Sequence, residues 1–290
     1  MLSGPTAGRF QCSPADADDP AWSPVDHLLD DPAAVERLVR AAGSGRFASD
    51  DRALVLAQIA REAIAVLVAA GVHAWATERR VPDLSAANVL LRDGPTGVVV
   101  GLRRPRSTVP PAHPEAGTAP DVEVLEEPKL FACFLDRVLG DPAPLGAAPP
   151  GPADRVAAVA AVVATVRRVV RVGDRHLWGT AALTLSSTLT RLGHTLGERA
   201  DDDRRRILAA RPDLARTIEL VTVADPDDPA GAPVTFAIRR TCCLLLKLPA
   251  GHQCGTCSLR DRDACVARMT AWALAGRAEA RAQPAPTPRV

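Results

Sequence analysis

The residues of this chain best suited to chemistry are its cysteines, of which there are seven in 290 residues. Four of them follow the pattern Cys-Cys-x10-Cys-x2-Cys near the C-terminus, namely Cys242, Cys243, Cys254 and Cys257. The ten residues between the pairs include Pro249 and Gly251, which are typical of a loop that turns the chain back. Such a loop brings four thiolates together. A tetrathiolate site suits tetrahedral Zn²⁺ or an iron–sulfur cluster.

The spacing within each cysteine pair helps to choose between these two metals. Cys254-Gly-Thr-Cys257 has the spacing of a zinc knuckle, in which two sulfurs bend onto one ion. Cys242 and Cys243 are adjacent, and adjacent side chains of a regular strand point to opposite faces. They therefore converge only if the backbone leaves strand geometry there. A [2Fe–2S] cluster is wider than one ion and accepts sulfurs from more divergent directions, so the spacing favours [2Fe–2S], and zinc stays open as the alternative.

The residues around the cysteines carry a family resemblance. Arg239-Arg-Thr-Cys-Cys-Leu244, Leu248-Pro and Cys254-Gly-Thr-Cys-Ser-Leu259 together resemble the C-terminal signature of the FhuF-like ferric siderophore reductases. The spacing matches without insertion, and Ser258 stands where that family commonly has proline. Upstream, His176-Leu-Trp-Gly-Thr180 resembles the family's Leu-Trp-Gly-Asn element, with threonine in the asparagine position. The resemblance covers roughly residues 150–266.

This resemblance implies a cytoplasmic [2Fe–2S] protein that reduces siderophore-bound Fe(III) to Fe(II) by one-electron transfer and so releases the iron. The ferric siderophore would be of the hydroxamate or catecholate class. Gly43-Ser-Gly45-Arg-Phe-Ala48 follows a helical pattern rather than a strand, so it lacks the context of a dinucleotide fingerprint. The electron must then come from an external donor such as a ferredoxin or a flavin reductase. The alternative is a non-enzymatic iron–sulfur or zinc-binding module in iron or redox sensing or in siderophore handling.

Four further residues are candidates for supporting roles at this site. Arg239 and Arg240 could neutralise the cluster or line an anionic siderophore site, but their side chains point oppositely in a strand, so at most one faces the cluster. His252 could donate a hydrogen bond to a cluster sulfur or relay a proton, although an exposed loop histidine is the simpler interpretation. Trp178 fits a core anchor better than a siderophore contact.

The other three cysteines are not assigned as ligands. Cys265 lies in an expected helix and Cys133 lies between two phenylalanines, so both are interpreted as core residues, and Cys12 as incidental.

Composition narrows the classes of partner and the compartment. Lys plus Arg is 35 and Asp plus Glu is 34, so the net charge is +1, and aromatic residues make up only 3% with no tyrosine. Neither the electrostatic footprint nor the stacking platforms of a nucleic-acid-binding protein are present. The N-terminus lacks the pattern of a secretory signal. The longest largely apolar run, Val156–Val166, is about half of what a bilayer requires, so no membrane span is expected.

The elements that must position the cysteines predict an α+β fold, predominantly helical, with a small antiparallel sheet and a C-terminal four-cysteine loop. The predicted regions are a disordered arm (1–24), a helical region with a β-hairpin (25–140), a reductase-like region (150–275, with the motif at 239–259) and a disordered tail (276–290). Helices are expected at about 32–42, 50–79, 129–139, 153–171, 175–197, 201–210 and 259–275. Strands are expected at 88–91, 98–102, 217–223 and 233–239. Ser49 is the expected N-cap of the long helix. Residues 103–120 are expected to form a surface loop, and 140–152 a domain boundary.

Overall fold

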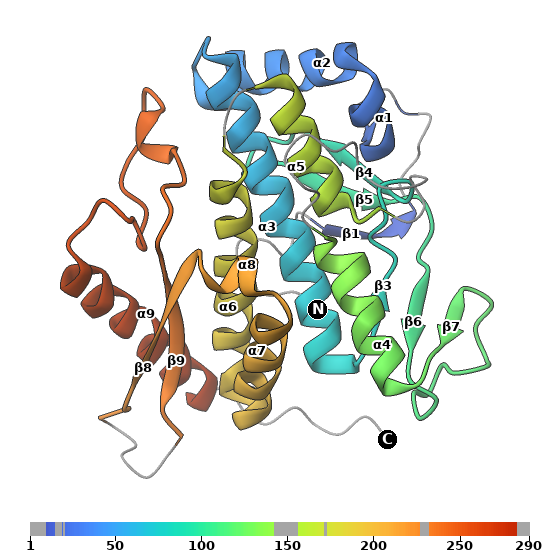
Figure 1. Ribbon diagram of the computed structural model, residues 1–290, viewed down its shortest axis with the longest axis vertical. Coiled ribbons are helices and arrows are strands. Elements are labelled where there is room, and N and C mark those ends of the chain that lie inside the picture. Colours follow the sequence, from blue (N-terminus) through green and yellow to red (C-terminus); the bar gives the residue numbers. More distant parts are fainter. Residues whose placement is uncertain are drawn as a thin grey trace.

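The computed structural model describes residues 10–14, 19, 21–141, 156–170, 173–226 and 232–282. Within these ranges the fold is α+β and mainly helical, as predicted. Figure 1 shows long central helices with two small sheets on one side and a β-hairpin with the C-terminal helix on the other.

The helices form the bulk of the described chain. In order they are α1 (Val25–Asp30), α2 (Pro32–Ala42), α3 (Arg52–Glu78), α4 (Glu127–Phe134), α5 (Ala158–Val169), α6 (Arg175–Leu196), α7 (Glu198–Ala210), α8 (Pro212–Ala215) and α9 (Arg262–Ala282). Two π-helical turns, Gly43–Phe47 and Leu135–Leu139, continue α2 and α4, and a 3₁₀ turn, Leu245–Lys247, lies in the cysteine loop.

The strands make three small sheets. The strands are β1 (Phe10–Pro14), β2 (Ser23–Pro24), β3 (Val81–Pro82), β4 (Val89–Arg92), β5 (Val99–Leu102), β6 (Ser107–Val109), β7 (Val122–Val124), β8 (Ile218–Val223) and β9 (Val234–Arg239). Their orders are β1-β5-β4-β2, β3-β6-β7 and β8-β9. Pairing is antiparallel except for β1 with β5 and β6 with β7. The predicted β4–β5 and β8–β9 hairpins are confirmed.

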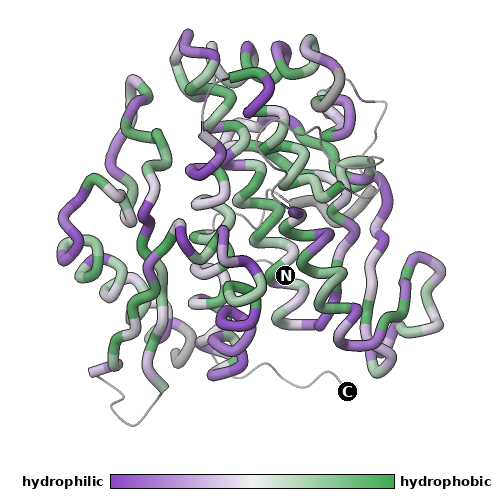
Figure 2. The backbone as a smooth tube through the Cα atoms, viewed as in Figure 1, coloured by the Kyte–Doolittle hydropathy of each residue, from purple (hydrophilic) through white to green (hydrophobic). Residues whose placement is uncertain are grey.

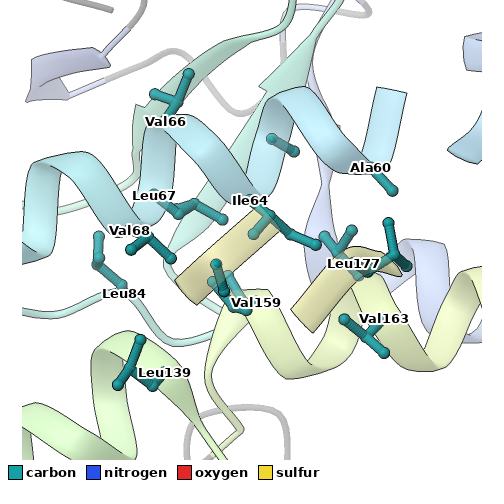
Figure 3. Close-up of a cluster of buried hydrophobic side chains, with 14 of the residues drawn as sticks. Ala60, Ile64, Val66, Leu67, Val68, Leu84, Leu139, Val159, Val163 and Leu177 are labelled. Atoms are coloured by element: carbon teal, nitrogen blue, oxygen red, sulfur yellow. The ribbon is translucent and has the colours of Figure 1, made fainter. Parts of the chain in front are cut away.

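Helix α3 is the centre of the hydrophobic core. It packs against α5 and α6, and side chains such as Ile64, Val159 and Leu177 from these three helices meet in one cluster (Figure 3). Figure 2 shows the hydrophobic stretches gathered in the central helices. Among the described residues α3 is the one helix long and apolar enough to cross a membrane, but 78% of its apolar window is buried inside the protein. This burial is consistent with the core helix of a soluble protein.

Helix α3 begins at a different cap from the one expected. The Asp51 side chain accepts a hydrogen bond from the Leu54 amide at 3.0 Å and is the N-cap. Ser49 instead accepts from the Asp51 amide at 3.2 Å, one step before the helix. Ser and Asp side chains both accept hydrogen bonds from the unpaired N–H groups at a helix start. The sequence therefore does not distinguish Ser49 from Asp51 as the cap, and the conformation of the preceding turn decides.

Three segments predicted to be irregular are partly ordered by pairing with distant residues. Within the 103–120 loop, β6 pairs with β3 and β7, and all three of its residues are buried. Within the N-terminal arm, β1 pairs with β5, and Trp22 packs with Leu90 and Val99. Helix α9 continues to Ala282, through part of the predicted tail. An ion pair of 3.4 Å between Arg277 and Asp225 holds this extension to the chain beyond β8.

The predicted boundary at 140–152 lies almost wholly outside the described residues. Its flanks do not have separate cores, since one hydrophobic cluster includes residues of α2 and α3 as well as residues of α5, α6 and β9. The two predicted regions therefore share a core, and the helices of the first region reach the cysteine loop of the second.

Candidate metal centre

The cysteine segment begins where the β8–β9 hairpin ends. The last antiparallel pair joins Ile218 to Arg239, and the Arg240 amide then donates to the Thr217 carbonyl at 2.9 Å. Beyond this point the chain leaves strand geometry, and Leu244 adopts a left-handed conformation with φ of 61°. The adjacent cysteines thus lie in irregular backbone, which is the condition that the sequence set for their convergence. In Figure 1 this loop projects at the edge of the molecule beside α9.

Two turns fold the rest of the loop back. At Gly251 a Cβ atom would lie 2.2 Å from the Leu245 carbonyl oxygen and 2.8 Å from that of Leu248, so the close approach of the backbone requires glycine. Further on, the Cys257 amide donates to the Cys254 carbonyl at 3.1 Å. The Cys-x2-Cys segment therefore forms the tight turn that its spacing predicted.

The turns bring two of the four predicted sulfurs into contact. The Sγ atoms of Cys243 and Cys254 lie 3.6 Å apart. Cys242 Sγ accepts a hydrogen bond from the Leu244 amide at 3.3 Å, and Cys257 is buried with 4% of its surface exposed. Across the described ranges no three His, Cys, Asp or Glu side chains are arranged to hold a metal ion. The structure thus shows one thiol pair, with the other two cysteines on the same loop.

The contact between the two thiols splits their acidities. A hydrogen bond with Cys254 lowers the pKa of the Cys243 thiol to about 5, and the nearby Arg239 guanidinium acts in the same direction against the opposing effect of burial. The same hydrogen bond raises the pKa of Cys254, reinforced by its burial and by the negative charge on Cys243. The contact therefore makes Cys243 the more acidic thiol of the two.

Helix α3 supplies one wall of this site, through residues that the sequence analysis did not identify. Gln58 Nε2 donates to the Cys243 carbonyl at 2.9 Å, and Gln58 Oε1 accepts from Arg61 Nε at 2.7 Å. The positive charge of Arg61 also acts on Cys243. Gln58 is fully buried in an otherwise apolar run of the helix. That isolated buried amide is the signal that marks this face of α3 in the sequence.

The N-terminal part of α6 supplies the second wall. Arg239 Nη2 donates to Thr180 Oγ1 at 3.2 Å. A Cβ atom on Gly179 would lie 2.2 Å from Thr241 Oγ1, so the helix and the segment before the cysteines are in close contact. The His176-Leu-Trp-Gly-Thr180 element and the cysteine motif, which are far apart in the sequence, are therefore packed directly against each other.

Several polar atoms on this wall are buried without a hydrogen-bond partner. They are His176 Nε2, Arg239 Nη1 and Thr241 Oγ1. Burial lowers the pKa of His176, and the charge of Arg239 adds to this effect, so its imidazole is neutral at pH 7. Buried polar atoms are normally paired, which makes this cluster of unpartnered atoms a property of the site that needs an explanation.

The remaining predicted residues divide clearly. Arg239 is buried and Arg240 is exposed, as the alternation of strand side chains predicted. His252 is exposed on the loop. Trp178 is only 5% exposed and packs in the main core, with the Arg211 guanidinium 5.2 Å from its ring centroid. This burial agrees with the core role that the sequence analysis favours for Trp178 over a siderophore contact.

Of the three cysteines outside the motif, Cys133 and Cys265 are predicted core residues and Cys12 is predicted to be incidental. Cys265 is buried in a small cluster with Phe236 and Met269, and its thiol contacts the Cys257 carbonyl at 3.4 Å. Cys133 is half-buried against the main core, and burial raises the pKa of its thiol. The Cys12 side chain lies outside the described residues.

The donor set and its surroundings fit a sulfur-ligated, anionic group. Cys242, Cys243, Cys254 and Cys257 lie on one loop, two of their sulfurs are already in contact, and none of the four is in a disulfide. Soft thiolates suit Zn²⁺ or iron–sulfur clusters. The buried guanidinium of Arg239, with an unpartnered N–H, suits an anion beside it.

No protein-family model matches the chain, and no curated protein matches it. The resemblance to the ferric siderophore reductases therefore rests on the residues quoted for it.

Proposed function

We propose that this protein is a cytoplasmic [2Fe–2S] protein that reduces siderophore-bound Fe(III) to Fe(II) by one-electron transfer and so releases the iron. The observation that carries the proposal is the four-cysteine loop, with the Cys243 and Cys254 sulfurs 3.6 Å apart beside the buried Arg239. Cys242 and Cys257 complete the ligand set when the loop closes on the bound group. The cluster would supply a one-electron carrier.

The reaction follows from how iron binds oxygen ligands. Hydroxamate and catecholate oxygens are hard and anionic, so they hold Fe(III) tightly and the softer, less charged Fe(II) weakly. One electron added to the chelate converts Fe(III) to Fe(II), and the freed ligand oxygens take up protons from solvent. The affinity lost by the chelate is the driving force for iron release.

The surroundings of the cysteines support an exchange of electrons with large partners. Leu246 and Leu259 on the cysteine segment are 42% and 63% exposed, and Lys247 is exposed beside them. This rim accepts a bulky chelate or an external donor, such as a ferredoxin or a flavin reductase. Toward the core, Gln58 of α3 holds the Cys243 backbone, and Cys243 and Cys257 are buried.

Anaerobic stopped-flow measurement tests this proposal. The protein is reduced with one equivalent of dithionite-derived electrons and mixed with a ferric trihydroxamate or a ferric tris-catecholate, with an Fe(II) chelator present. The proposal predicts that visible absorption returns to the oxidised form as one Fe(II) is trapped per electron, over repeated cycles. If neither chelate reoxidises the reduced protein, the proposal is contradicted.

The second candidate is a non-enzymatic zinc or iron–sulfur binding module. The Cys254–Cys257 turn favours its zinc form specifically. The Cys257 amide donates a hydrogen bond to the Cys254 carbonyl, and the resulting tight turn carries two cysteines at the spacing of a zinc knuckle. Both forms of this candidate predict no electron transfer to a ferric chelate. The zinc form also predicts a colourless protein that retains one zinc after expression with iron and cysteine supplied.

A further inference from the structure

The buried arginines of this protein differ in how their charge is balanced. Three arginines among the described residues are buried: Arg204, Arg211 and Arg239. Arg204 pairs with Asp201, and Arg211 pairs with Asp213. No carboxylate of the described residues lies within ion-pair distance of Arg239. A buried charge without a counter-charge costs several kcal/mol, so the charge of Arg239 needs a partner of another kind.

The opposite charges that act on Arg239 come from cysteines. Cys243, Cys254 and Cys242 favour its charged form, in that order, and the positive charge of Arg61 opposes it. Nη2 is held by Thr180 at 3.2 Å, while Nη1 is buried with no partner. The side chain is thus fixed at one terminal nitrogen, and the other terminal nitrogen has no acceptor among the described residues.

We propose that Arg239 is the counter-ion of the metal centre held by the four cysteines, and that the N-terminal part of α6 positions it there through Thr180. The proposal deepens the function proposed above but does not require siderophore reduction. Four thiolates around Zn²⁺, or around an oxidised [2Fe–2S] cluster, leave a net charge of −2, and the reduced cluster carries −3. A fixed positive charge stabilises all three states, and it stabilises the reduced cluster most.

This assignment also gives the His176-Leu-Trp-Gly-Thr180 element a role. Trp178 anchors the helix in the core, Gly179 lets α6 approach Thr241, and Thr180 holds the guanidinium. The element acts on the centre through Arg239, and neither Trp178 nor Thr180 needs to touch substrate.

The exposed neighbour Arg240 provides a matched control. Arg239→Gln and Arg240→Gln each remove one positive charge from consecutive residues, but only Arg239 is buried beside the cysteines. Arg239→Lys keeps the charge and loses the fork of N–H donors. Thr180→Val keeps the charge and removes the hydroxyl that holds it. Circular dichroism and thermal unfolding of each full-length variant establish that it folds.

The first measurement is the reduction potential of the reconstituted protein. For Arg239→Gln we expect the ratio of reduced to oxidised cluster, at the wild-type midpoint, to fall about tenfold, which is a shift of about 59 mV to more negative potential for one electron. Arg239→Lys recovers part of this shift, and Arg240→Gln changes the ratio less than about twofold. A wild-type midpoint in Arg239→Gln, or an equal shift in Arg240→Gln, overturns the proposal.

The second measurement does not depend on a cluster. Co²⁺ alone is titrated into the reduced apoprotein, and thiolate-to-Co²⁺ absorption reports binding. We expect Arg239→Gln to weaken binding about tenfold and Thr180→Val to weaken it to a smaller extent, whereas Arg240→Gln binds like wild type. Unchanged affinity in both Arg239→Gln and Thr180→Val overturns the proposal. If Arg239→Gln fails to fold, the comparison of Thr180→Val and Arg239→Lys with wild type decides.

The two arms separate this proposal from the function above. If Co²⁺ binding depends on Arg239 but no ferric chelate is reduced, the counter-ion proposal stands and the reductase proposal fails. If chelates are reduced but the potential does not depend on Arg239, the reductase proposal stands and the counter-ion proposal fails.

Discussion

The contact between Gly179 and Thr241 gives a prediction whose sign can be worked out from the structure. Gly179 lies within α6, where alanine is intrinsically more favourable than glycine by about 1 kcal/mol. A Cβ at this position, however, would meet Thr241 Oγ1 at 2.2 Å and Thr241 Cβ at 3.3 Å. Overpacking of this kind costs about 1–3 kcal/mol, and so short a contact with a β-branched side chain belongs at the upper end. The clash therefore exceeds the helical gain, and Gly179→Ala destabilises the protein by about 1–2 kcal/mol.

The double variant Gly179→Ala/Thr241→Ala isolates the cause. Thr241→Ala removes the clashing oxygen, and because that hydroxyl is buried without a partner, its loss alone changes the free energy of unfolding by less than about 1 kcal/mol. In the double variant the helical gain of alanine remains and the clash with the hydroxyl is absent, while the Cβ of residue 241 still lies 3.3 Å away and has to shift slightly. The double variant is therefore expected to be at least as stable as Thr241→Ala alone, with a gain of at most about 1 kcal/mol.

Urea unfolding of the four apoproteins, followed by circular dichroism, measures this double-mutant cycle. The expected coupling energy is about 1–3 kcal/mol in favour of the double variant. A Gly179→Ala protein as stable as wild type, or additive effects in the double variant, would refute the close packing of α6 on the segment before the cysteines. The account of how Thr180 reaches Arg239 would fail with it.

Three further predictions follow from the core and the walls of the site. Gln58→Leu removes the hydrogen bond to the Cys243 carbonyl, so it is expected to lower the free energy of unfolding in urea by about 1–3 kcal/mol and to speed alkylation of Cys243 in the apoprotein. Gln58→Glu keeps the shape of the side chain but loses the same donor, and it is expected to have both effects too; wild-type behaviour of both variants would contradict a role for this hydrogen bond. An apolar cavity of about 20 Å³ borders Val162, so Val162→Ile should raise the free energy of unfolding by about 0.5–1 kcal/mol; a loss of stability would mean that the cavity cannot take one methylene. The pKa of His176 is held below its ordinary value of 6.5 by burial and by Arg239, so the unfolded chain binds more protons than the folded protein below pH 6.5. Stability of the apoprotein should therefore fall as the pH drops from 7 to 5, and this slope should be shallower in His176→Gln; equal slopes in both proteins contradict the burial of a neutral imidazole.

Local patterns predicted the long helices and the hairpins well. The apolar residues of α3 and α6 extend over many turns, and the β4–β5 and β8–β9 pairs each join strands that follow one another in the sequence, so nearby residues decide each structure. Strands β1 and β6 are different, because each is short and acquires its hydrogen bonds from partners far along the chain. The local sequence does not predict such distant partners, and the prolines near these strands favour the prediction of a loop.

The candidate site shows the same division. The cysteine spacing identified the loop, and the period of a strand predicted that only one of Arg239 and Arg240 would face it. Gln58, in contrast, reaches Cys243 from 185 residues away, and that contact depends on the packing of α3 against the rest of the core. The unpartnered nitrogen of Arg239 is likewise a tertiary feature, since its meaning depends on which groups surround it.

The measurement that tests the central claim most directly is the content of the centre. The protein is purified anaerobically after expression with iron and cysteine supplied, and iron, acid-labile sulfide and zinc are quantified, with EPR after dithionite reduction. The account predicts about two irons and two sulfides per chain, with an S = 1/2 signal that is lost in Cys254→Ser and kept in Cys133→Ser, which alters a cysteine outside the motif. Zinc without sulfide would contradict it, because a protein without an electron carrier cannot reduce a ferric chelate.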